Sequence, residues 1–367
     1  MLRVAIDGTP LLGARTGVGE VVDGFATELG HRDDLEVVAY ALTWRGRHEL
    51  AAAVPSGVRA ATSPMPARFV RAAWMRTDHP RIERWTGPVD VVHATNYVGP
   101  PARARVLVSV YDLGFVRFPE LCTGDAMQYP ELLRRAIRRG AWIHTTSDFV
   151  THEVLDAFDI PAERVARVYP GIPPIQDGDA ARGRTLARAT RYVLAIGTIE
   201  PRKNLPTLVR AFDGLAAADP DLALVVVGTR AWGAEAFDDA CARAHHRSRI
   251  HLLGYVTTED RRDLLAGASA LAYPSRYEGF GFPPLEAMVA GVPVVAARAG
   301  AIPEVVGDAA LLVDPDDVDA LAAALDTVLH DEASRRALVA RGRVRHENFS
   351  WVRAADELSA VYREVIR

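Results

Sequence analysis

Two glutamates with seven residues between them, Glu278 and Glu286, enclose a loop rich in glycine, phenylalanine and proline. Gly279 and Gly281 free the backbone to curl around a ligand, and the proline pair suits the first positions of a helix. The pattern predicts that Glu286 lies in the first turn of that helix. Backbone N–H groups there can hold a phosphate, while Glu286 accepts hydrogen bonds from ribose hydroxyls and Glu278 faces a sugar. The alternative is a pair of surface glutamates beside a loop, for which the apolar Phe280 is an unusual choice.

A second cluster, Gly-Thr-Ile-Glu-Pro-Arg-Lys-Asn at residues 197–204, contains Arg202 and Lys203. It follows an expected strand and precedes an expected helix, which is where a doubly wound sheet binds phosphates. Arginine offers a planar fork of donors and lysine a compact charge, and a diphosphate leaving group can use both. Of the 43 basic residues, 42 are arginine and Lys203 is the single lysine. This placement favours a functional role over the alternative, a solvated charge pair that caps a loop.

A glycine-rich loop at residues 13–20, Gly-Ala-Arg-Thr-Gly-Val-Gly-Glu, lies between the first expected strand and its helix. Its glycines, among them Gly17 and Gly19, let the backbone approach a ligand, and the helix N-terminus offers N–H groups to an anion. The spacing matches neither the dinucleotide-binding fingerprint nor the P-loop. A ligand-binding loop and a plain tight turn both stay open for this segment.

Short apolar runs alternate with helical stretches along the chain, which is typical of parallel strands buried on both faces. The expected strands are residues 2–6, 37–42, 89–93, 106–110, 142–145, 192–196, 222–227, 250–253, 270–273, 292–296 and 309–313. The main expected helices are residues 18–29, 126–139, 148–158 after the N-cap Ser147, 205–217, 234–246, 258–266, 285–290, 318–329, 332–346 and 351–366.

A stretch rich in proline, glycine, aspartate and arginine interrupts this alternation after residue 169. The sequence therefore predicts two doubly wound, Rossmann-like α/β domains at residues 1–170 and 191–350, a linker at 171–190 and a final helix at 351–367. Such sheets bind ligands at the carboxyl ends of their strands. A cleft between the two domains is accordingly the expected site.

The composition excludes several classes of protein. With 367 residues, 49% apolar and 25% charged, the chain has the balance of a folded protein of two ordinary domains. The net charge of −4 provides no basic field for sequence-independent nucleic-acid binding. Cys122 and Cys241 show neither zinc-ligand spacing nor a disulfide framework, so no metal site is expected. The N-terminus lacks a signal-peptide pattern, and no apolar run reaches the ~18 residues of a membrane span, so a cytoplasmic protein is expected.

Taken together, these segments resemble the retaining glycosyltransferases of family four, which have the two-domain GT-B fold. The similarity covers nearly the whole chain: the Gly-Val-Gly loop at 17–19, SVYDLGFVRFPE at 109–120, TTSDF at 145–149, YPGI at 169–172, GTIEPRKN at 197–204, GYV at 254–256 and the two glutamates at 278 and 286. The resemblance implies a nucleoside-diphosphate-sugar donor held mainly by the C-terminal domain and an acceptor held by the N-terminal one. It also implies retention of anomeric configuration, with no metal and no cofactor.

On this resemblance, Arg202 and Lys203 clamp the donor diphosphate and stabilise the charge that develops on the leaving group, and Glu278 contacts the donor sugar. These three are the expected catalytic residues. Glu286 is assigned to the ribose, and the backbone of the Gly-Tyr-Val segment to the base. The expected donor-binding residues are Gly17, Gly19, Tyr255, Val256, Gly279, Phe280, Gly281 and Glu286. The helix at 351–366 is expected to return to the first domain.

The chain departs from the family where many relatives have His-Asp, because it has Tyr111-Asp112. These two residues are expected to contact the acceptor or the donor sugar. A tyrosine, with a pKa of about 10, is a poor general base near neutral pH. Transfer in the family is often described as a front-face process in which the departing phosphate oxygen takes the acceptor proton, so the loss of histidine need not abolish activity. Asp112 is either catalytic or a cap of its loop, and both interpretations stay open.

The resulting hypothesis is a retaining, metal-independent hexosyltransferase that acts on a glycan or glycolipid hydroxyl. GDP-mannose is the first choice of donor, since relatives with similar PRKN and EGFGFP loops include mannosyltransferases, and UDP-sugars are the alternative. A nucleotide-sugar epimerase, which needs no acceptor, fits the motifs less well. A catalytically degenerate protein that binds a nucleotide sugar without transferring it is the alternative from another class.

A basic and aromatic stretch at residues 68–76 mixes arginine with Phe69 and Trp74, as a membrane-surface helix does. Four arginines within residues 134–139 add a second basic cluster to the same domain. Peripheral contact of the N-terminal domain with the inner face of a membrane is one interpretation. Ordinary solvated helices with buried aromatic rings are the other.

Overall fold

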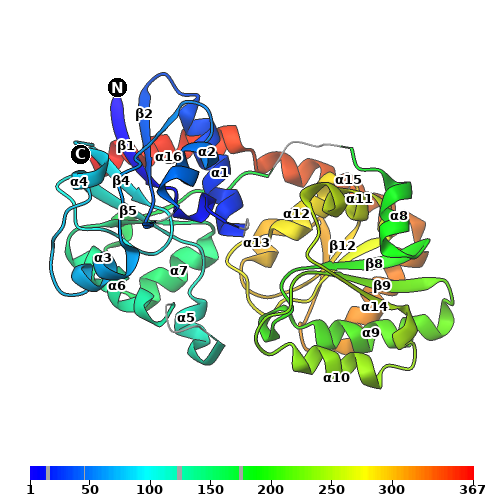
Figure 1. Ribbon diagram of the computed structural model, residues 1–367. Coiled ribbons are helices and arrows are strands. Elements are labelled where there is room, and N and C mark those ends of the chain that lie inside the picture. The colour runs from blue at the N-terminus through cyan, green and yellow to red at the C-terminus, as the bar shows by residue number, and fades with distance from the viewer. Residues whose placement is uncertain (14–16, 45, 122–125, 173–176) are drawn as a thin grey trace. The chain divides into compact units, whose positions relative to one another are not determined.

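The computed structural model describes residues 1–13, 17–44, 46–121, 126–172 and 177–367. Over these residues the chain forms two compact units, one of Met1–Gly171 together with Phe349–Arg367 and the other of Ile172–Asn348. Each unit has a parallel sheet with helices on both faces, as the alternating pattern predicts (Figure 1). We call them the first and the second unit.

The sheet of the first unit has, within the described ranges, seven parallel strands in the order β3-β2-β1-β4-β5-β6-β7. They are β1 (Leu2–Asp7), β2 (Leu35–Tyr40), β3 (Val58–Ala60), β4 (Val91–Ala94), β5 (Arg105–Val110), β6 (Trp142–Thr145) and β7 (Val165–Arg167). The chain order reverses between β1 and β4, which pair directly. Ligands of doubly wound sheets bind beside such a reversal. The sequence did not predict β3 and β7, because three-residue strands at sheet edges give no apolar run.

Helices cover both faces of this sheet. Helices α1 (Gly17–Gly30) and α16 (Trp351–Val365) pack together on one face, and α3 (Ala67–Trp74) and α6 (Tyr129–Arg138) lie on the other (Figure 1). The remaining helices are α2 (Arg47–Ala53), α4 (Glu83–Thr86), α5 (Gly114–Arg117) and α7 (Asp148–Ala157), with short 3-10 turns at Thr9–Leu11, Pro119–Leu121, Ala126–Gln128 and Ala162–Arg164. Ser147 caps α7 by accepting a hydrogen bond from the Val150 N–H, as predicted.

Helix α16 belongs to the first unit, as the resemblance implies. Its start is capped by Ser350, whose hydroxyl accepts from the Arg353 N–H. Gly24 of α1 has no room for a side chain, because a Cβ there would lie 2.4 Å from the Trp351 ring. The same ring meets Phe25 edge-on, with 5.4 Å between ring centroids. A small residue on α1 thus lets the two helices pack closely.

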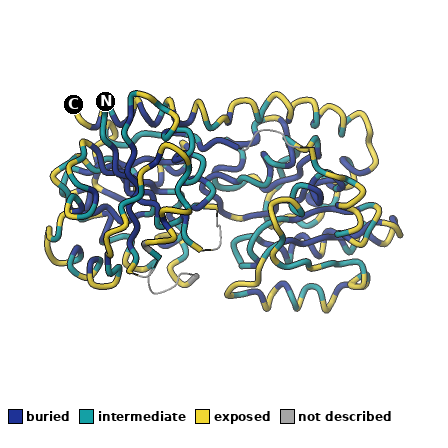
Figure 2. The backbone as a smooth tube through the Cα atoms, turned by 45° about the horizontal axis from the view of Figure 1, so that its top comes forward, coloured by how far each residue is buried: buried dark blue, intermediate teal, exposed yellow. Residues whose placement is uncertain are grey.

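The sheet of the second unit has six parallel strands among the described residues, in the order β10-β9-β8-β11-β12-β13. They are β8 (Arg191–Ile196), β9 (Leu222–Val227), β10 (Ile250–Gly254), β11 (Ala270–Tyr273), β12 (Val294–Ala297) and β13 (Ala310–Val313). The chain order reverses between β8 and β11. Strands β9, β11 and β12 are buried along their length, and β8 is buried except at its two ends (Figure 2). Apolar contact on both faces explains why these strands are visible in the sequence as continuous apolar runs.

The helices of the second unit lie in two layers. One face of the sheet has α9 (Leu205–Ala218), α10 (Glu235–Arg243) and α14 (Val318–His330). The other has α8 (Ala180–Ala187), α11 (Thr258–Gly267), α12 (Phe282–Val289) and α15 (Glu332–Arg345) (Figure 1). Helix α13 (Ile302–Val306) and 3-10 turns at Pro201–Lys203, Arg247–Arg249 and His346–Asn348 complete the set.

Helix α8 lies within the stretch predicted as a linker at 171–190 and belongs to the second unit. Asp179 caps the helix by accepting from the N–H groups of Ala181 and Arg182. Arg188 ends it in the left-handed conformation. The irregular part within the described residues is therefore shorter than predicted, and residues 173–176 of the expected linker lie outside them.

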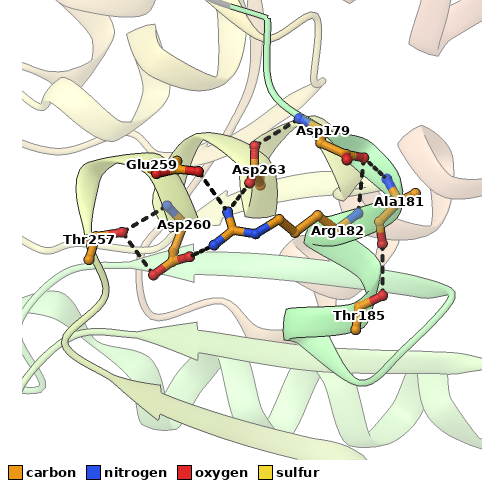
Figure 3. Close-up of polar contacts among 8 residues, drawn as sticks. All are labelled: Asp179, Ala181, Arg182, Thr185, Thr257, Glu259, Asp260 and Asp263. Carbon is orange, nitrogen blue, oxygen red and sulfur yellow. Dashed lines mark hydrogen bonds and ion pairs between the residues drawn. The ribbon is translucent and has the colours of Figure 1, made fainter.

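Contacts with α11 explain why local composition did not reveal α8. The Arg182 guanidinium faces Glu259, Asp260 and Asp263 of α11 (Figure 3). Gly183 lies so close to α11 that a Cβ would be 1.9 Å from the Asp263 carbonyl oxygen. These partners are about 80 residues away along the chain. The helix is consequently stabilised by tertiary contacts rather than by its own sequence pattern.

Helix α3 carries the basic and aromatic residues considered for a membrane surface. Trp74 is buried, and its indole N–H donates to the Pro80 carbonyl at 2.8 Å. Phe69 is 80% exposed. One of the two rings therefore belongs to the core and the other faces solvent. Across the part of the chain that the structure describes, no helix combines the length and apolar character needed to cross a membrane.

Candidate functional site

A lysine, a glutamate and a tyrosine meet at the carboxyl ends of β8 and β11. The Lys203 Nζ lies 2.5 Å from Glu278 Oε1 and 3.4 Å from the Tyr273 hydroxyl oxygen. The Tyr273 hydroxyl donates to the same glutamate oxygen at 2.8 Å. Glu278 and Tyr273 are 7% and 3% exposed. The structure thus joins Lys203 and Glu278, both expected from the sequence, in a buried ion pair, and adds Tyr273 as a third member.

The charges around this ion pair keep the glutamate ionised. Burial by itself raises the pKa of Glu278, but the positive charges of Lys203 and Arg202 outweigh burial and hold that pKa below its ordinary value. Burial, and next the Glu278 charge, raise the pKa of Tyr273 well above its ordinary value. The cluster therefore contains an ionised carboxylate and a neutral phenol, with two cations close by.

Arg202 has an acidic partner of its own, because its Nε lies 3.0 Å from Glu200 Oε1. Each expected cation is thus matched by a carboxylate, Arg202 by Glu200 and Lys203 by Glu278. An anion that binds here has to share or replace these carboxylates as partners of the cations. Once an anion has taken its place beside Lys203, Glu278 becomes available to accept hydrogen bonds from ligand hydroxyls.

Asn204 fixes the loop that carries Lys203 and Arg202. It has a φ of 54°, a left-handed conformation that asparagine tolerates better than most residues. Its Nδ2 donates to the Pro274 and Pro315 carbonyls at 3.1 and 2.6 Å, and its Oδ1 accepts from the Thr207 hydroxyl at 2.8 Å. Asn204 is only 1% exposed. Sequence analysis missed this role, for which an asparagine directly before a Leu-Pro helix start is the available signal.

Gly300 fixes the backbone of Glu278. Its φ is +57°, and a Cβ there would lie 2.6 Å from the Glu278 carbonyl oxygen and 2.7 Å from the Glu278 nitrogen. The next residue, Ala301, donates its N–H to that carbonyl at 2.9 Å. The loop before α13 therefore needs glycine in order to hold the glutamate in place.

Helix α12 begins at Phe282, after Gly281 in a left-handed conformation with φ 104°. Glu286 therefore lies in the second turn, and the prediction that it lies in the first turn is wrong. The left-handed glycine caps the helix one residue earlier than the proline pair suggests. Phe280 is 6% exposed and contacts Phe282, with 5.0 Å between ring centroids, so this loop is apolar because it is buried. Gly279, in the same loop, is also buried.

Glu286 pairs with an arginine rather than with the lysine cluster. Its Oε1 lies 3.2 Å from the Arg261 Nη2 of α11. Both residues line a cavity of about 730 Å³ between α11 and α12, which also has Thr258 and Arg343 in its wall. That volume is within the ordinary range for a small-molecule site. Sequence analysis did not single out Arg261, because it lies in a charged helix that looks solvated.

Tyr255 and Val256 follow β10 and lead into α11, which Thr257 caps by accepting from the Asp260 N–H. Tyr255 is 67% exposed and Val256 is partly buried. Their side chains take part in none of the contacts described above. Their assignment to the base stays a prediction.

The remaining predicted residues belong to the first unit. Gly17 is the first residue of α1 and Gly19 is buried in it, while residues 14–16 of the glycine loop lie outside the described residues. Asp112 Oδ1 accepts from the Gly114 N–H at 2.9 Å, the contact of a residue that caps the loop leading into α5. This geometry supports the capping interpretation and leaves a catalytic one untested. Burial raises the pKa of Tyr111, so its phenol is neutral.

Within the described ranges, no three His, Cys, Asp or Glu side chains gather in a group that could hold a metal ion. Cys241 is a free thiol, and burial raises its pKa to about 11. Cys122 lies outside the described residues.

Comparison with protein families gives two matches that follow each other along the chain. Residues 15–175 match Glycosyltransferase Family 4, and residues 181–345 match Glycosyl transferases group 1. Among curated proteins, the O-antigen chain mannosyltransferase B of Escherichia coli is 34% identical over 78% of this chain and 78% of its own length. The D-inositol 3-phosphate glycosyltransferase of Salinispora tropica is 32% identical over 77% of this chain, which spans 65% of that protein.

Solved structures agree with these matches in fold. The sucrose-phosphate synthase of Thermosynechococcus elongatus aligns with a TM-score of 0.76 and 20% identity, over 100% of this chain and 99% of that one. Anabaena HepE in complex with UDP and glucose aligns with a TM-score of 0.74 and 18% identity, over 99% and 100%. Both sheets have the parallel order of the GT-B fold. The match of residues 15–175 to Glycosyltransferase Family 4 and the identity to the Escherichia coli mannosyltransferase show that the chain belongs to the family-four glycosyltransferases.

Proposed function

We propose that the chain is a retaining, metal-independent mannosyltransferase that moves mannose from GDP-mannose to a hydroxyl of a glycan or glycolipid. The observation that carries this proposal is the buried ion pair of Lys203 and Glu278, with Arg202 beside it, at the reversal of the second sheet. The identity to an O-antigen chain mannosyltransferase supports the choice of mannose and of a glycan acceptor. Because the donor is already activated by its nucleotide, the reaction needs no cofactor.

In the proposed reaction, the bond between the sugar C1 and the donor phosphate oxygen breaks, and the acceptor oxygen forms a bond to C1 on the same face. The departing phosphate oxygen takes the proton of the acceptor hydroxyl. The charge that develops on the phosphate is stabilised by the Lys203 ammonium and the Arg202 guanidinium. A fixed donor of this kind is worth about 3–4 kcal/mol in a transition state.

Binding of the donor changes the partners of both carboxylates in this account. Phosphate oxygens compete with Glu278 for Lys203, which frees Glu278 to accept hydrogen bonds from the sugar hydroxyls. Glu286, held by Arg261 at the cavity between α11 and α12, accepts from the ribose hydroxyls. The backbone of Gly279 to Gly281 faces the phosphates, and the backbone near Tyr255 and Val256 the base. In the first unit, Gly17 and Gly19 contact the donor.

A UDP-sugar is the alternative donor. Anabaena HepE, which shares the fold, was solved with UDP and with UDP-glucose. A degenerate protein that binds a nucleotide sugar without transferring it also stays open, because Tyr111 stands where many relatives have histidine.

We further propose that the protein acts in the cytoplasm and contacts the inner face of a membrane through the first unit. The exposed ring of Phe69 on the basic helix α3 supports this contact. Sedimentation with anionic liposomes at low salt tests it, and Phe69→Ala should reduce the bound fraction. Equal amounts of wild type in the supernatant with and without liposomes would remove the proposal.

A thermal-shift screen against GDP, UDP, ADP and their sugar conjugates tests the donor. A ligand at 100 times its Kd stabilises the native state by about 2.7 kcal/mol. We expect GDP and GDP-mannose to raise the melting temperature and Glu286→Ala to reduce the shift. A shift with UDP ligands alone would replace mannose by a UDP-sugar, and no shift with any nucleotide would contradict the proposed function.

A further inference from the structure

A cavity of about 480 Å³ lies in the first unit, at the amino ends of β4, β5 and β6. Its wall contains residues just before these strands, the start of β5, the end of α6 and Ile366 after α16. Ligands of doubly wound sheets bind at the opposite, carboxyl ends. Because β5 has six residues, its two ends lie about 17–20 Å apart. The cavity is therefore separate from the expected transfer site, and its volume is ordinary for a small-molecule ligand.

A segment of alternating alanine and arginine, residues 102–105, forms one side of this cavity. Glu83 fixes its backbone, because the Glu83 Oε1 accepts from the N–H groups of Arg103 and Ala104. Arg103 and Arg105 are exposed, and within the described ranges neither guanidinium group has a hydrogen-bond or ion-pair partner. The small alanines leave space for a ligand, and the arginines bring two unpaired positive charges to it.

A third arginine, Arg139, adds a less exposed guanidinium group to the wall. Its Nη2 donates to the Gly99 carbonyl at 2.8 Å, and its Nη1 lies 3.3 Å from an oxygen of Asp78, whose side chain is 61% exposed. Among the described residues of the wall, Asp90 is the single acid. Its Oδ2 accepts from the Arg3 N–H at 2.8 Å, so a backbone group is its partner. Three arginines and one carboxylate give the cavity a net positive charge.

The charged and apolar parts of the wall together indicate one class of ligand. The planar fork of arginine binds phosphate oxygens through paired, charge-assisted hydrogen bonds. A phosphate monoester carries up to two negative charges, which matches the excess of arginine over aspartate. Apolar contact is available from Val89, Pro100, Val106 and Ile366. A ligand that uses the whole wall therefore combines a phosphate group with an apolar part.

We propose that this cavity is a second binding site, which takes a phosphate ester with an apolar substituent and holds its phosphate through Arg103, Arg105 and Arg139. A phospholipid headgroup and a soluble phosphate ester share this chemistry. The site lies outside the donor machinery of the second unit, so the proposal does not depend on the proposed transfer reaction.

Isothermal titration of hexyl phosphate into the full chain tests the site. We expect binding at least about tenfold tighter than that of inorganic phosphate, because the hexyl group buries apolar surface. Arg105→Ala should weaken it by about tenfold or more, since it removes a charge-assisted contact. Arg59→Ala, which removes an exposed arginine of β3 at the far edge of the same sheet, is the charge-matched control and should bind as wild type does.

Arg202→Ala separates this cavity from the phosphate site proposed for the second unit, and it should bind hexyl phosphate as wild type does. Absence of binding to wild type, equal affinity of wild type and Arg105→Ala, or loss of binding in Arg202→Ala would overturn the proposal. Equal affinity for hexyl phosphate and inorganic phosphate would overturn it as well, because the apolar wall would then contribute nothing.

Ala102→Leu tests the cavity without a change of charge. The larger side chain should occupy part of the space and weaken the binding of hexyl phosphate, with a melting temperature close to that of wild type. An unchanged affinity would place the phosphate outside the cavity and overturn the proposal.

Sedimentation with phosphatidylcholine vesicles, with and without phosphatidic acid, distinguishes the two sources of the phosphate. Binding to the vesicles with phosphatidic acid that is lost in Arg105→Ala and kept in Arg59→Ala would identify a lipid headgroup. Binding of hexyl phosphate without such vesicle binding would identify a soluble ester, and both results support the site. If neither probe binds, the proposal is wrong.

Discussion

The carboxyl ends of the two sheets have similar topology and different chemistry. In the second unit, the reversal of strand order carries ionised groups, with Lys203 against Glu278 and Arg202 beside them. In the first unit, β4, β5 and β6 carry neutral imidazoles and a hydroxyl, with Ser109 between His93 and His144. Charged groups therefore gather at the strand ends of the second sheet, and neutral, hydrogen-bonded groups lie on the strands of the first.

The difference follows from how the buried groups of each sheet are satisfied. Cations at a buried site need carboxylate partners until an anionic ligand such as a diphosphate arrives. The buried imidazoles and hydroxyls of the first sheet stay neutral, and each is satisfied by a hydrogen bond to another. A shared architecture thus positions both clusters, while the side chains at the strand ends decide the chemistry of each.

The largest expected effect comes from breaking the ion pair of Lys203 and Glu278 in the second unit, which we call the charged edge together with Arg202. Lys203→Ala leaves the Glu278 carboxylate buried without its ammonium partner, which should reduce the free energy of unfolding by about 3–5 kcal/mol. Arg276→Ala is the matched control, because its pair with Asp316 has side chains 43% and 67% exposed and should contribute less than about 1 kcal/mol. Urea unfolding of both variants measures the difference. Similar losses of unfolding free energy in the two variants would show that the buried pair contributes no more than the exposed one.

In the first unit, acid should lower the free energy of unfolding through the buried His144. The folded pKa of His144, about 4, lies below its ordinary value of 6.5, so the unfolded chain binds more protons between these values. Stability is therefore full above pH 6.5 and falls as the pH drops towards 4, by about 3 kcal/mol for this one residue. Urea unfolding across this range, compared with His144→Gln, isolates the effect. Parallel curves for wild type and variant would contradict it.

A smaller effect is expected where the backbone supports the charged edge. Gly300→Ala places a Cβ against the Glu278 backbone in a left-handed conformation, which should cost about 1–3 kcal/mol and weaken donor binding. Gly214→Ala in α9 is the control, because its Cβ would meet nothing within 4 Å, and it should stabilise the protein by about 0.5–1 kcal/mol. Thermal unfolding with and without GDP reports both quantities. Unchanged donor binding in Gly300→Ala would mean that Glu278 does not depend on this loop.

The smallest effect lies away from both clusters. Arg182→Ala removes the contacts of α8 with three acidic residues of α11, and the α8 amides should then exchange hydrogen faster while those of β8 stay protected. Arg184→Ala, on the same helix, should change little. Equal exchange in the two variants would show that Gly183 and the packing of α8, rather than Arg182, hold the helix.

Most of the fold could be predicted from the sequence, because parallel strands buried on both faces give apolar runs such as 222–227 and 270–273. Three of the elements that were missed depend on tertiary contact. Helix α8 is held by α11, and β3 and β7 are three-residue strands that pair along sheet edges. The start of α12 was misplaced because the left-handed Gly281, and not a proline, caps it.

The candidate site likewise contains residues that the sequence revealed and residues that it did not. Arg202, Lys203 and Glu278 were found from residue type and spacing, since their loops directly follow strands. Tyr273 was missed because a buried tyrosine at a strand end has no distinctive pattern, and Asn204 was missed although it stands directly before a Leu-Pro helix start. In the first unit, the hydrogen-bonded chain of His93, Ser109, His144 and Tyr362 is assembled from four elements, and each residue taken alone looks like an ordinary core position.

The central claim is that the charged edge of the second unit is a nucleoside-diphosphate site. Isothermal titration of GDP and UDP into wild type, Arg202→Ala and Arg276→Ala tests it most directly. We predict that GDP binds to wild type and to Arg276→Ala with equal affinity, and at least about tenfold more weakly to Arg202→Ala, which lacks a charge-assisted contact to the phosphates. Equal binding of either nucleotide to all three proteins, or binding of neither to wild type, would contradict the account.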